Sequence, residues 1–207
     1  HDLPLLTPGQ KVEVYRKLFR GRQDVYAVRW QSSGGRSGYA VACANEWMPV
    51  ICQKPRIKCG ECRHKNFKPL DFDAVYDHLS GKHVTGLYPL LPDSSCYLLA
   101  ADFDKGDWKA NVRALAQACR GEGVPYLMEV SRSGAGAHLW VFFSEAVQAS
   151  SARRLGFKLL DKAMELHPGL SFDSYDRLFP NQDTMPDGGF GNLIALPLQH
   201  EARSRGC

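Results

Sequence analysis

The stretch Leu98-Leu-Ala-Ala-Asp102-Phe-Asp104 is an apolar run that ends in two aspartates two positions apart. Such a run predicts a buried strand. Because successive side chains of a strand alternate between its faces, Asp102 and Asp104 are expected to point the same way and Phe103 the opposite way. Two converging carboxylates need a cation or a raised pKa, and a pair of Mg²⁺ or Mn²⁺ ions would satisfy both. On this motif alone, a solvent-exposed turn with capping aspartates is the stronger interpretation.

Predicted helices and strands interleave on both sides of this run. Apolar residues at helical spacing predict helices over 10–21, 71–79, 108–119 and 149–166. Apolar or alternating runs predict strands over 24–30, 83–91, 96–104, 125–130, 137–143, 170–175 and 190–196. This order predicts an α+β (mixed α/β) fold. The chain is expected to form one unit over 1–207, with a module inserted at 43–67.

Composition and charge exclude several classes of protein. The chain has 207 residues, of which 44% are hydrophobic and 23% charged, as in ordinary globular proteins rather than disordered or fibrous ones. No apolar run approaches the ~18 residues that span a bilayer, and no signal peptide opens the chain, so a cytoplasmic location without a membrane partner is expected. The formal net charge of +4 is too small to indicate a nucleic-acid partner by itself.

Four of the seven cysteines fall within twenty residues, as Cys43, Cys52, Cys59 and Cys62. The odd number of cysteines and the missing signal peptide favour a reducing compartment over a disulfide framework. There, a cluster of four thiols is typical of a structural, tetrahedral Zn²⁺ site. His64 could replace one thiol. The alternative is two unrelated buried cysteines beside a lone C-x2-C pair.

Basic residues surround this cysteine cluster. They are Lys54, Arg56, Lys58, Arg63, His64, Lys65 and Lys68. Such a local positive charge suits a phosphate backbone. A solvated surface around a zinc site explains it nearly as well.

A glycine-rich segment, Ser131-Arg-Ser-Gly-Ala-Gly-Ala-His138, joins two predicted strands. Glycines allow a ligand to approach the backbone closely, and exposed amides can bind an anion. The side chains of Arg132, Ser133 and His138 and the backbone of Gly134 could therefore contact phosphate oxygens. The segment is not a Walker loop, because no Gly-Lys-Ser/Thr follows. His138 could instead be a core histidine with satisfied hydrogen bonds.

A third polar segment covers residues 171–183. It contains Asp173 and Asp176, either of which could complete a metal site with Asp102 and Asp104. Residues here that could hold a nucleotide are Arg177, Asn181 and Gln182. For any single one of them, a polar surface loop is the simpler interpretation.

In this order, the three segments resemble the motifs of the archaeo-eukaryotic primase superfamily. That family carries D-x-D or D-x-E, then S-x-H, here spread over Ser133–His138, then an acid after an apolar residue. More closely, the chain resembles the primase-polymerase domain of prokaryotic TOTE conflict systems. The similar stretches cover nearly the whole chain: residues 15–22, the four-cysteine segment, and residues 86–90, 102–104, 131–140, 174–183 and 188–199.

The resemblance implies a primase-like catalytic core with an RRM-like sheet and an inserted zinc module. It implies template-dependent transfer of NTPs or dNTPs to a 3′-hydroxyl, and initiation of primers when a second nucleotide replaces the primer end. Asp102 and Asp104 would bind two Mg²⁺ or Mn²⁺ ions. Asp176 is favoured over Asp173 as the third carboxylate, because it lies in the family-like Ser-Tyr-Asp-Arg stretch. Residues implied at the triphosphate are Ser133 and His138, helped by Arg132 and Arg177.

The implied partners are a DNA template, a primer strand and an NTP or dNTP. The start at His1 and the end at Cys207, soon after the last motif, suggest a piece of a longer protein. The resemblance implies fused helicase or nuclease domains there, in the cytoplasm of a prokaryote. One rival is a metal-dependent nuclease, against which the Ser133–His138 segment argues. The other is a zinc-containing nucleic-acid-binding module, which leaves Asp102 and Asp104 without a role.

Overall fold

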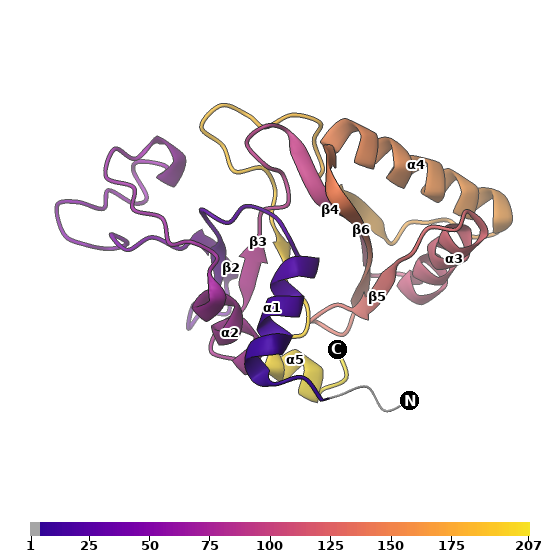
Figure 1. Cartoon of the computed structure of the whole chain (residues 1–207), viewed down its shortest axis with the longest axis horizontal. Helices are drawn as coiled ribbons and strands as arrows, with labels where there is room; N and C mark the ends of the chain where they lie inside the picture. Colours follow the sequence, from indigo (N-terminus) through magenta and orange to yellow (C-terminus); the bar gives the residue numbers. More distant parts are fainter. Residues whose placement is uncertain (1–4) are drawn as a thin grey trace.

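A computed structural model describes residues 5–207 as two four-stranded antiparallel sheets with five α-helices (Figure 1). The helices are α1 (Pro8–Leu18), α2 (Phe72–Ser80), α3 (Trp108–Gly121), α4 (Ala149–Leu166) and α5 (His200–Ser204). The strands are β1 (Ala27–Gln31), β2 (Ser37–Val41), β3 (Thr85–Leu87), β4 (Ser95–Asp104), β5 (Leu127–Val130), β6 (Gly136–Gln148), β7 (Tyr175–Phe179) and β8 (Ile194–Ala195). The predicted mixed α/β class is confirmed. Among residues 5–207, no helix is both long and apolar enough to cross a membrane.

The second sheet has the strand order β5-β6-β4-β7 and is built from the continuous series β4-α3-β5-β6-α4-β7. This β-α-β-β-α-β arrangement is the one expected for an RRM-like sheet. Both helices cover one face, as Figure 1 shows. On that face, Leu99, Ala101 and Phe103 of β4 are buried against α3 and α4. The alternate residues of β4 therefore face the other way, toward the first sheet.

The first sheet has the strand order β2-β1-β3-β8. Apolar residues of α1 pack in one core with residues of both sheets. Thr7 begins α1 with a capping box to Gln10. The ring of Phe19, just after α1, packs edge-on against Trp140 of β6, with 5.2 Å between centroids. A shared apolar core therefore holds the two sheets together on the face of the second sheet that the helices leave free.

The cysteine segment connects β2 to α2 and is mainly turns, with one short 3₁₀ helix at Cys59–Glu61. Its two ends meet at an isolated bridge between Cys43 and Phe67. Figure 1 shows that the segment projects from the edge of the first sheet. This projection is the region that the sequence predicts as an inserted module.

Several predicted elements differ from those observed. The strand predicted at 170–175 is wrong, because Phe172 adopts a positive φ of 55° and packs into the core from a turn. The sequence also missed β2, whose serine and glycine resemble a loop but pair with β1 in a hairpin. The strands predicted at 83–91 and 190–196 are much shorter, as β3 and β8.

His78 of α2 is fully buried and links three segments. Its Nδ1 accepts a hydrogen bond from the backbone N–H of Thr85 at 3.1 Å, and its Nε2 lies 2.8 Å from the carbonyl oxygen of Pro197. One nitrogen accepts and the other donates, which requires the neutral ring. Burial, the largest influence, lowers the pKa of His78 to about 4.

We expect this buried histidine to make stability fall as the pH drops from about 6.5 to 4. The folded pKa lies below the unfolded value of about 6.5, so the unfolded chain binds the extra proton in this window, and the loss approaches about 3 kcal/mol. Urea unfolding at pH 7 and pH 4.5 measures it. A His78→Phe variant should be less stable at pH 7 and lose this part of the slope; equal slopes in both proteins would contradict the prediction.

Candidate active site

Four charged residues form a row across the second sheet. In the strand register, Glu129 of β5 lies opposite His138 of β6, His138 opposite Asp102 of β4, and Asp102 opposite Arg177 of β7. Since Phe103 faces α3 and α4, Asp102 and the row lie on the helix-free face. Formal charges alternate along the row when His138 is protonated.

His138 lies between two carboxylates and is largely buried. Its Nδ1 is 2.5 Å from Glu129 Oε1, and its Nε2 is 3.4 Å from Asp102 Oδ1. Burial lowers the pKa of His138, but the Asp102 and Glu129 carboxylates beside it outweigh this effect and raise the pKa to about 9. Burial raises the pKa of Glu129 as well, against the lowering effect of His138. The two neighbouring carboxylates therefore favour the protonated form of His138.

Asp104 ends β4 and is exposed, whereas Phe103 is fully buried. The expected alternation is therefore found, with Asp104 following Asp102 along the same strand. The backbone N–H of Asp104 donates to the carbonyl of Ser174 at 2.7 Å, just before β7. This bond fixes the end of β4 beside the start of β7.

The glycine-rich segment is a tight hairpin turn between β5 and β6. The N–H of Gly134 donates to the carbonyl of Ser131 at 2.8 Å, and Gly134 has a φ of +76°, which favours glycine. A side chain at Gly136 would collide with the carbonyl oxygen of Phe103. Because Gly136 pairs with Asp104, the turn that carries Ser133 lies at the same end of the sheet as the two aspartates.

Arg132 connects this hairpin to the C-terminal segment. A pocket between them is lined by Glu129, Arg132, His138 and residues of 195–207. The backbone carbonyl of Arg132 accepts a hydrogen bond from Arg205 at 3.2 Å. His78 and the Tyr15 hydroxyl both bond the carbonyl of Pro197, which lies in the same wall. The core of the first sheet thus supports one side of the pocket.

A bulge brings Asp176 next to the row. Asp102 pairs with Arg177, but the next residue, Phe103, pairs with Tyr175. Asp176 is therefore the extra residue of a β-bulge in β7. Arg177 Nε donates to Asp176 Oδ2 at 2.6 Å. Asp173 lies in the preceding turn, outside the ladder.

The structure does not bring Asn181 and Gln182 to the carboxylates. Strand β7 runs antiparallel to β4, away from Asp102. The loop that follows β7 returns near the start of β4, where the N–H of Met185 donates to Ser94 Oγ at 2.9 Å. Seven residues of extended strand separate Ser95, at that end of β4, from Asp102, which corresponds to about 24 Å.

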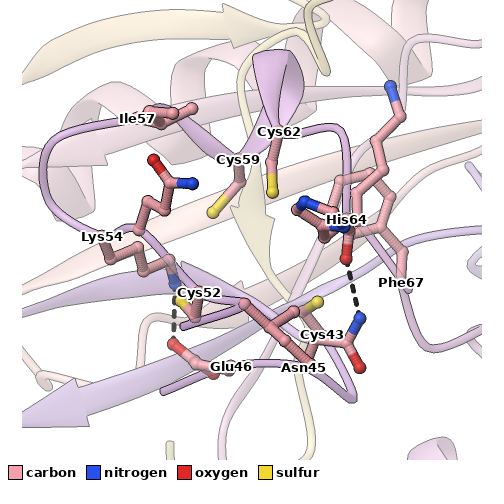
Figure 2. Close-up of a pocket in the computed structure, with 13 residues that line it drawn as sticks. Cys43, Asn45, Glu46, Cys52, Lys54, Ile57, Cys59, Cys62, His64 and Phe67 are labelled. Carbon is pink, nitrogen blue, oxygen red and sulfur yellow. Dashed lines mark hydrogen bonds and ion pairs between the residues drawn. The ribbon is translucent and has the colours of Figure 1, made fainter. Parts of the chain in front are cut away.

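The four predicted zinc ligands line a single pocket with His64, as Figure 2 shows. The Lys54 ammonium enters from one side, 2.7 Å from Glu46 Oε1. Burial lowers the pKa of Lys54, but hydrogen bonds to Glu46 and Cys59 raise it overall. Within residues 5–207, no group of three or more His, Cys, Asp or Glu side chains has the geometry of a metal site. The donor types fit zinc, because soft thiolates select it.

Sequence reasoning missed Glu129. It lies in a short strand between Met128 and Val130, and only the pairing with β6 places it at His138. A charged residue inside an apolar strand was the available signal. Sequence reasoning also missed Asn111 of α3, which is buried and donates to Ser174 Oγ at 2.7 Å, next to the bond that fixes Asp104.

Comparisons with known proteins identify the family. No curated protein matches the chain. A solved structure, the polymerase domain of Mycobacterium tuberculosis ligase D in complex with DNA, is similar with a TM-score of 0.44 and 14% identity, over 79% of this chain and 65% of that one. The chain thus spans just under two thirds of that structure. The family profile described as "TOTE conflict system, Archaeo-Eukaryotic Primase domain" matches residues 10–207. The chain therefore belongs to the archaeo-eukaryotic primase domain family of TOTE conflict systems.

Proposed function

We propose that the chain is a template-dependent nucleotidyl transferase that adds NTPs or dNTPs to the 3′-hydroxyl of a DNA primer and can start primers from two nucleotides. The observation that carries this is the charged row from Glu129 to Arg177, with Asp104 and the glycine-rich turn at the same end of the sheet. Carboxylates that suit metal ions and cations that suit a triphosphate are adjacent there. Family membership supports nucleotidyl transfer as the class of reaction.

In this proposal, Asp102, Asp104 and Asp176 hold two Mg²⁺ or Mn²⁺ ions. When bound, the ions would lower the pKa of the attacking 3′-hydroxyl and stabilise the leaving pyrophosphate. Their ligands are hard carboxylate oxygens, which both ions prefer. Asp102 has a partly exposed side chain and only a long contact to His138, so it can turn toward an ion.

In this proposal, the cationic side chains of the site bind the triphosphate of the incoming nucleotide. The Nδ1–H of the His138 imidazolium donates to Glu129. The Nε2–H lies 3.4 Å from Asp102 and can donate to a phosphate oxygen instead. Ser133, the backbone of Gly134, Arg132 and Arg177 add donors around it. Asn181 and Gln182 are left out of this site, because they follow the end of β7, which runs away from Asp102.

The cysteine pocket is proposed to hold a structural Zn²⁺ through Cys43, Cys52, Cys59 and Cys62, with His64 as an alternative ligand. Four thiolates around a divalent ion leave a net negative charge, and the Lys54 ammonium is placed to offset it. The proposed partners are a DNA template and primer. We also propose that helicase or nuclease domains are fused to the chain or associate with it. The proposed location is the cytoplasm of a prokaryote.

The test is a primer-extension assay with the purified chain, primed and unprimed DNA templates, dNTPs or NTPs, and Mn²⁺ or Mg²⁺. Extension or new primers are expected from the unsubstituted chain and none from Asp102→Ala/Asp104→Ala. Degradation of the DNA that also needs the two aspartates would support the rival metal-dependent nuclease. Binding without either reaction would support the rival nucleic-acid-binding module.

Asp176→Asn is expected to lower kcat/KM for nucleotide addition about 100-fold, because it removes a charged metal ligand. Asp173→Asn, three residues earlier and outside the β4–β7 ladder, should change it less than about threefold. Steady-state kinetics of both variants measure the difference. The reverse ranking would make Asp173 the third ligand.

Glu129→Gln is expected to raise KM for the incoming nucleotide and lower kcat/KM about tenfold, because the carboxylate that orients His138 is replaced by a neutral amide. Glu145→Gln, an exposed position on the same β6 strand as His138, is the control. An unchanged KM for the nucleotide in Glu129→Gln would contradict the role of Glu129 as a positioning residue.

A further inference from the structure

An open groove of about 1050 Å³ lies on the first sheet, away from the charged row. Tyr26, Val28 and Trp30 line it from one face of β1 and its approach. On the opposite face, Arg29 pairs with Tyr39. Burial raises the pKa of Tyr39, and the charges of Arg132 and Arg29 act to lower it. Tyr39 and Arg29 lie on the face of the β1–β2 hairpin opposite Tyr26, Val28 and Trp30.

Two tryptophans in the groove wall are unusually accessible. Trp30 is 45% exposed and Trp47 is 68% exposed. A Cβ at Gly38 would lie 3.0 Å from the Trp30 ring, so the ring rests on the backbone of β2 at a position where glycine leaves room for it. Lys54 lies 5.7 Å from the centre of the Trp47 ring. Exposed indole rings beside cations are typical of platforms on which bases stack.

The groove carries a positive charge that its own carboxylates do not cancel. Its charged side chains are four cations, Arg36, Lys54, Lys68 and Lys82, and two anions, Glu46 and Asp77, so the net charge is 4 − 2 = +2 with His83 neutral. Both carboxylates are already paired, Glu46 with Lys54 and Asp77 with Lys82, each at 2.7 Å. Arg36 and Lys68 are exposed, and within residues 5–207 neither forms an ion pair.

The size of the groove favours a strand over a single nucleotide. Sites for drug-sized molecules have volumes of roughly 300–1,000 Å³ and enclose most of the ligand. The volume of this groove, about 1050 Å³, lies just above that range. His83 adds a polar atom, Nε2, that is buried in the wall and has no hydrogen-bond partner within residues 5–207.

We propose that this groove binds a single strand of DNA, with bases stacked on Trp30 and Trp47 and phosphates near Arg36 and Lys68. The choice of DNA over RNA rests on the proposed template. The presence of a strand-binding groove rests on the groove residues alone.

The test measures binding of a fluorescein-labelled 12-mer of dT to the full chain by anisotropy. Trp47→Ala is expected to weaken binding at least about tenfold, because it removes a ring on which a base stacks. Arg36→Glu/Lys68→Glu is expected to weaken it by at least about the same factor, because it removes two phosphate contacts. The charge variant should also flatten the dependence of log K on log salt, by about one unit for each lost phosphate contact. Thermal melting confirms that each variant is folded.

Matched controls lie on α4, far from the groove. Phe157→Ala, whose ring is 43% exposed, and Lys158→Glu should bind the 12-mer like the unsubstituted chain. The assay measures binding and not primer extension, so this test stands even if the chain proves not to be a polymerase. Groove variants that bind as tightly as the unsubstituted chain would overturn the proposal. Tighter binding of a 12-mer of rU than of dT would overturn the assignment to DNA.

Discussion

Asp102→Asn is expected to reduce primer extension by at least about 10³-fold, equivalent to about 4 kcal/mol of lost transition-state stabilisation. The amide keeps the size of the side chain and an oxygen that can accept from His138, but it removes the charge that would bind the ions. Because the side chain is only partly buried, the thermal midpoint should move by no more than a few degrees. Single-turnover extension in Mn²⁺ and a melting curve measure the two quantities.

The control for this substitution is Asp161→Asn, an exposed carboxylate on α4. It should extend primers at the unsubstituted rate, because α4 lies on the face of the sheet opposite the charged row. If Asp102→Asn kept more than about a tenth of the extension rate, the assignment of Asp102 as a metal ligand would be wrong. If it unfolded, Asp102→Glu would separate charge from structure.

Cys59→Ser is expected to lower the zinc content from about one ion per chain to nearly none. Structural zinc contributes apparent binding free energies of about 10–16 kcal/mol in small domains. The segment from Cys43 to Phe67 has little regular structure and is closed by one bridge, so it should become sensitive to proteases without the ion. Elemental analysis and limited proteolysis measure both effects.

Cys207→Ser is the matched control, because Cys207 is a partly exposed thiol outside the cysteine pocket. It should keep its zinc and its resistance to protease. Absence of zinc from the unsubstituted protein, purified without chelators, would contradict the zinc proposal. So would a Cys59→Ser variant with unchanged zinc content and proteolysis.

Local signals in the sequence predicted two of the helices and the strand that carries Asp102 and Asp104. Asp71 and Gly81 predict the two ends of α2. In the structure, the Asp71 side chain caps the first turn and Gly81 ends the helix in a left-handed conformation. The apolar spacing over 149–166 matches α4. The apolar run before Asp102 matches β4 to within one residue. These features depend on contacts within a few residues, which a local pattern can encode.

Features that depend on strand pairing were harder to predict. Glu129 joins the candidate site only through its partner in β6. Asn181 and Gln182 follow Arg177 closely in sequence, but the antiparallel direction of β7 carries them away from it. The bulge beside Asp176 is a property of two strands together. Strand direction and register decide which side chains meet, and sequence proximity alone does not encode them.

Template-directed transfer is tested most directly by changing one base. A primed DNA template would present A, C, G or T at the first unpaired position, with all four nucleotides and Mn²⁺ present. The added nucleotide is expected to be the complement in each case, and Asp102→Asn should add none. Addition of the same nucleotide opposite all four bases, or no addition by the unsubstituted chain, would contradict the proposed function.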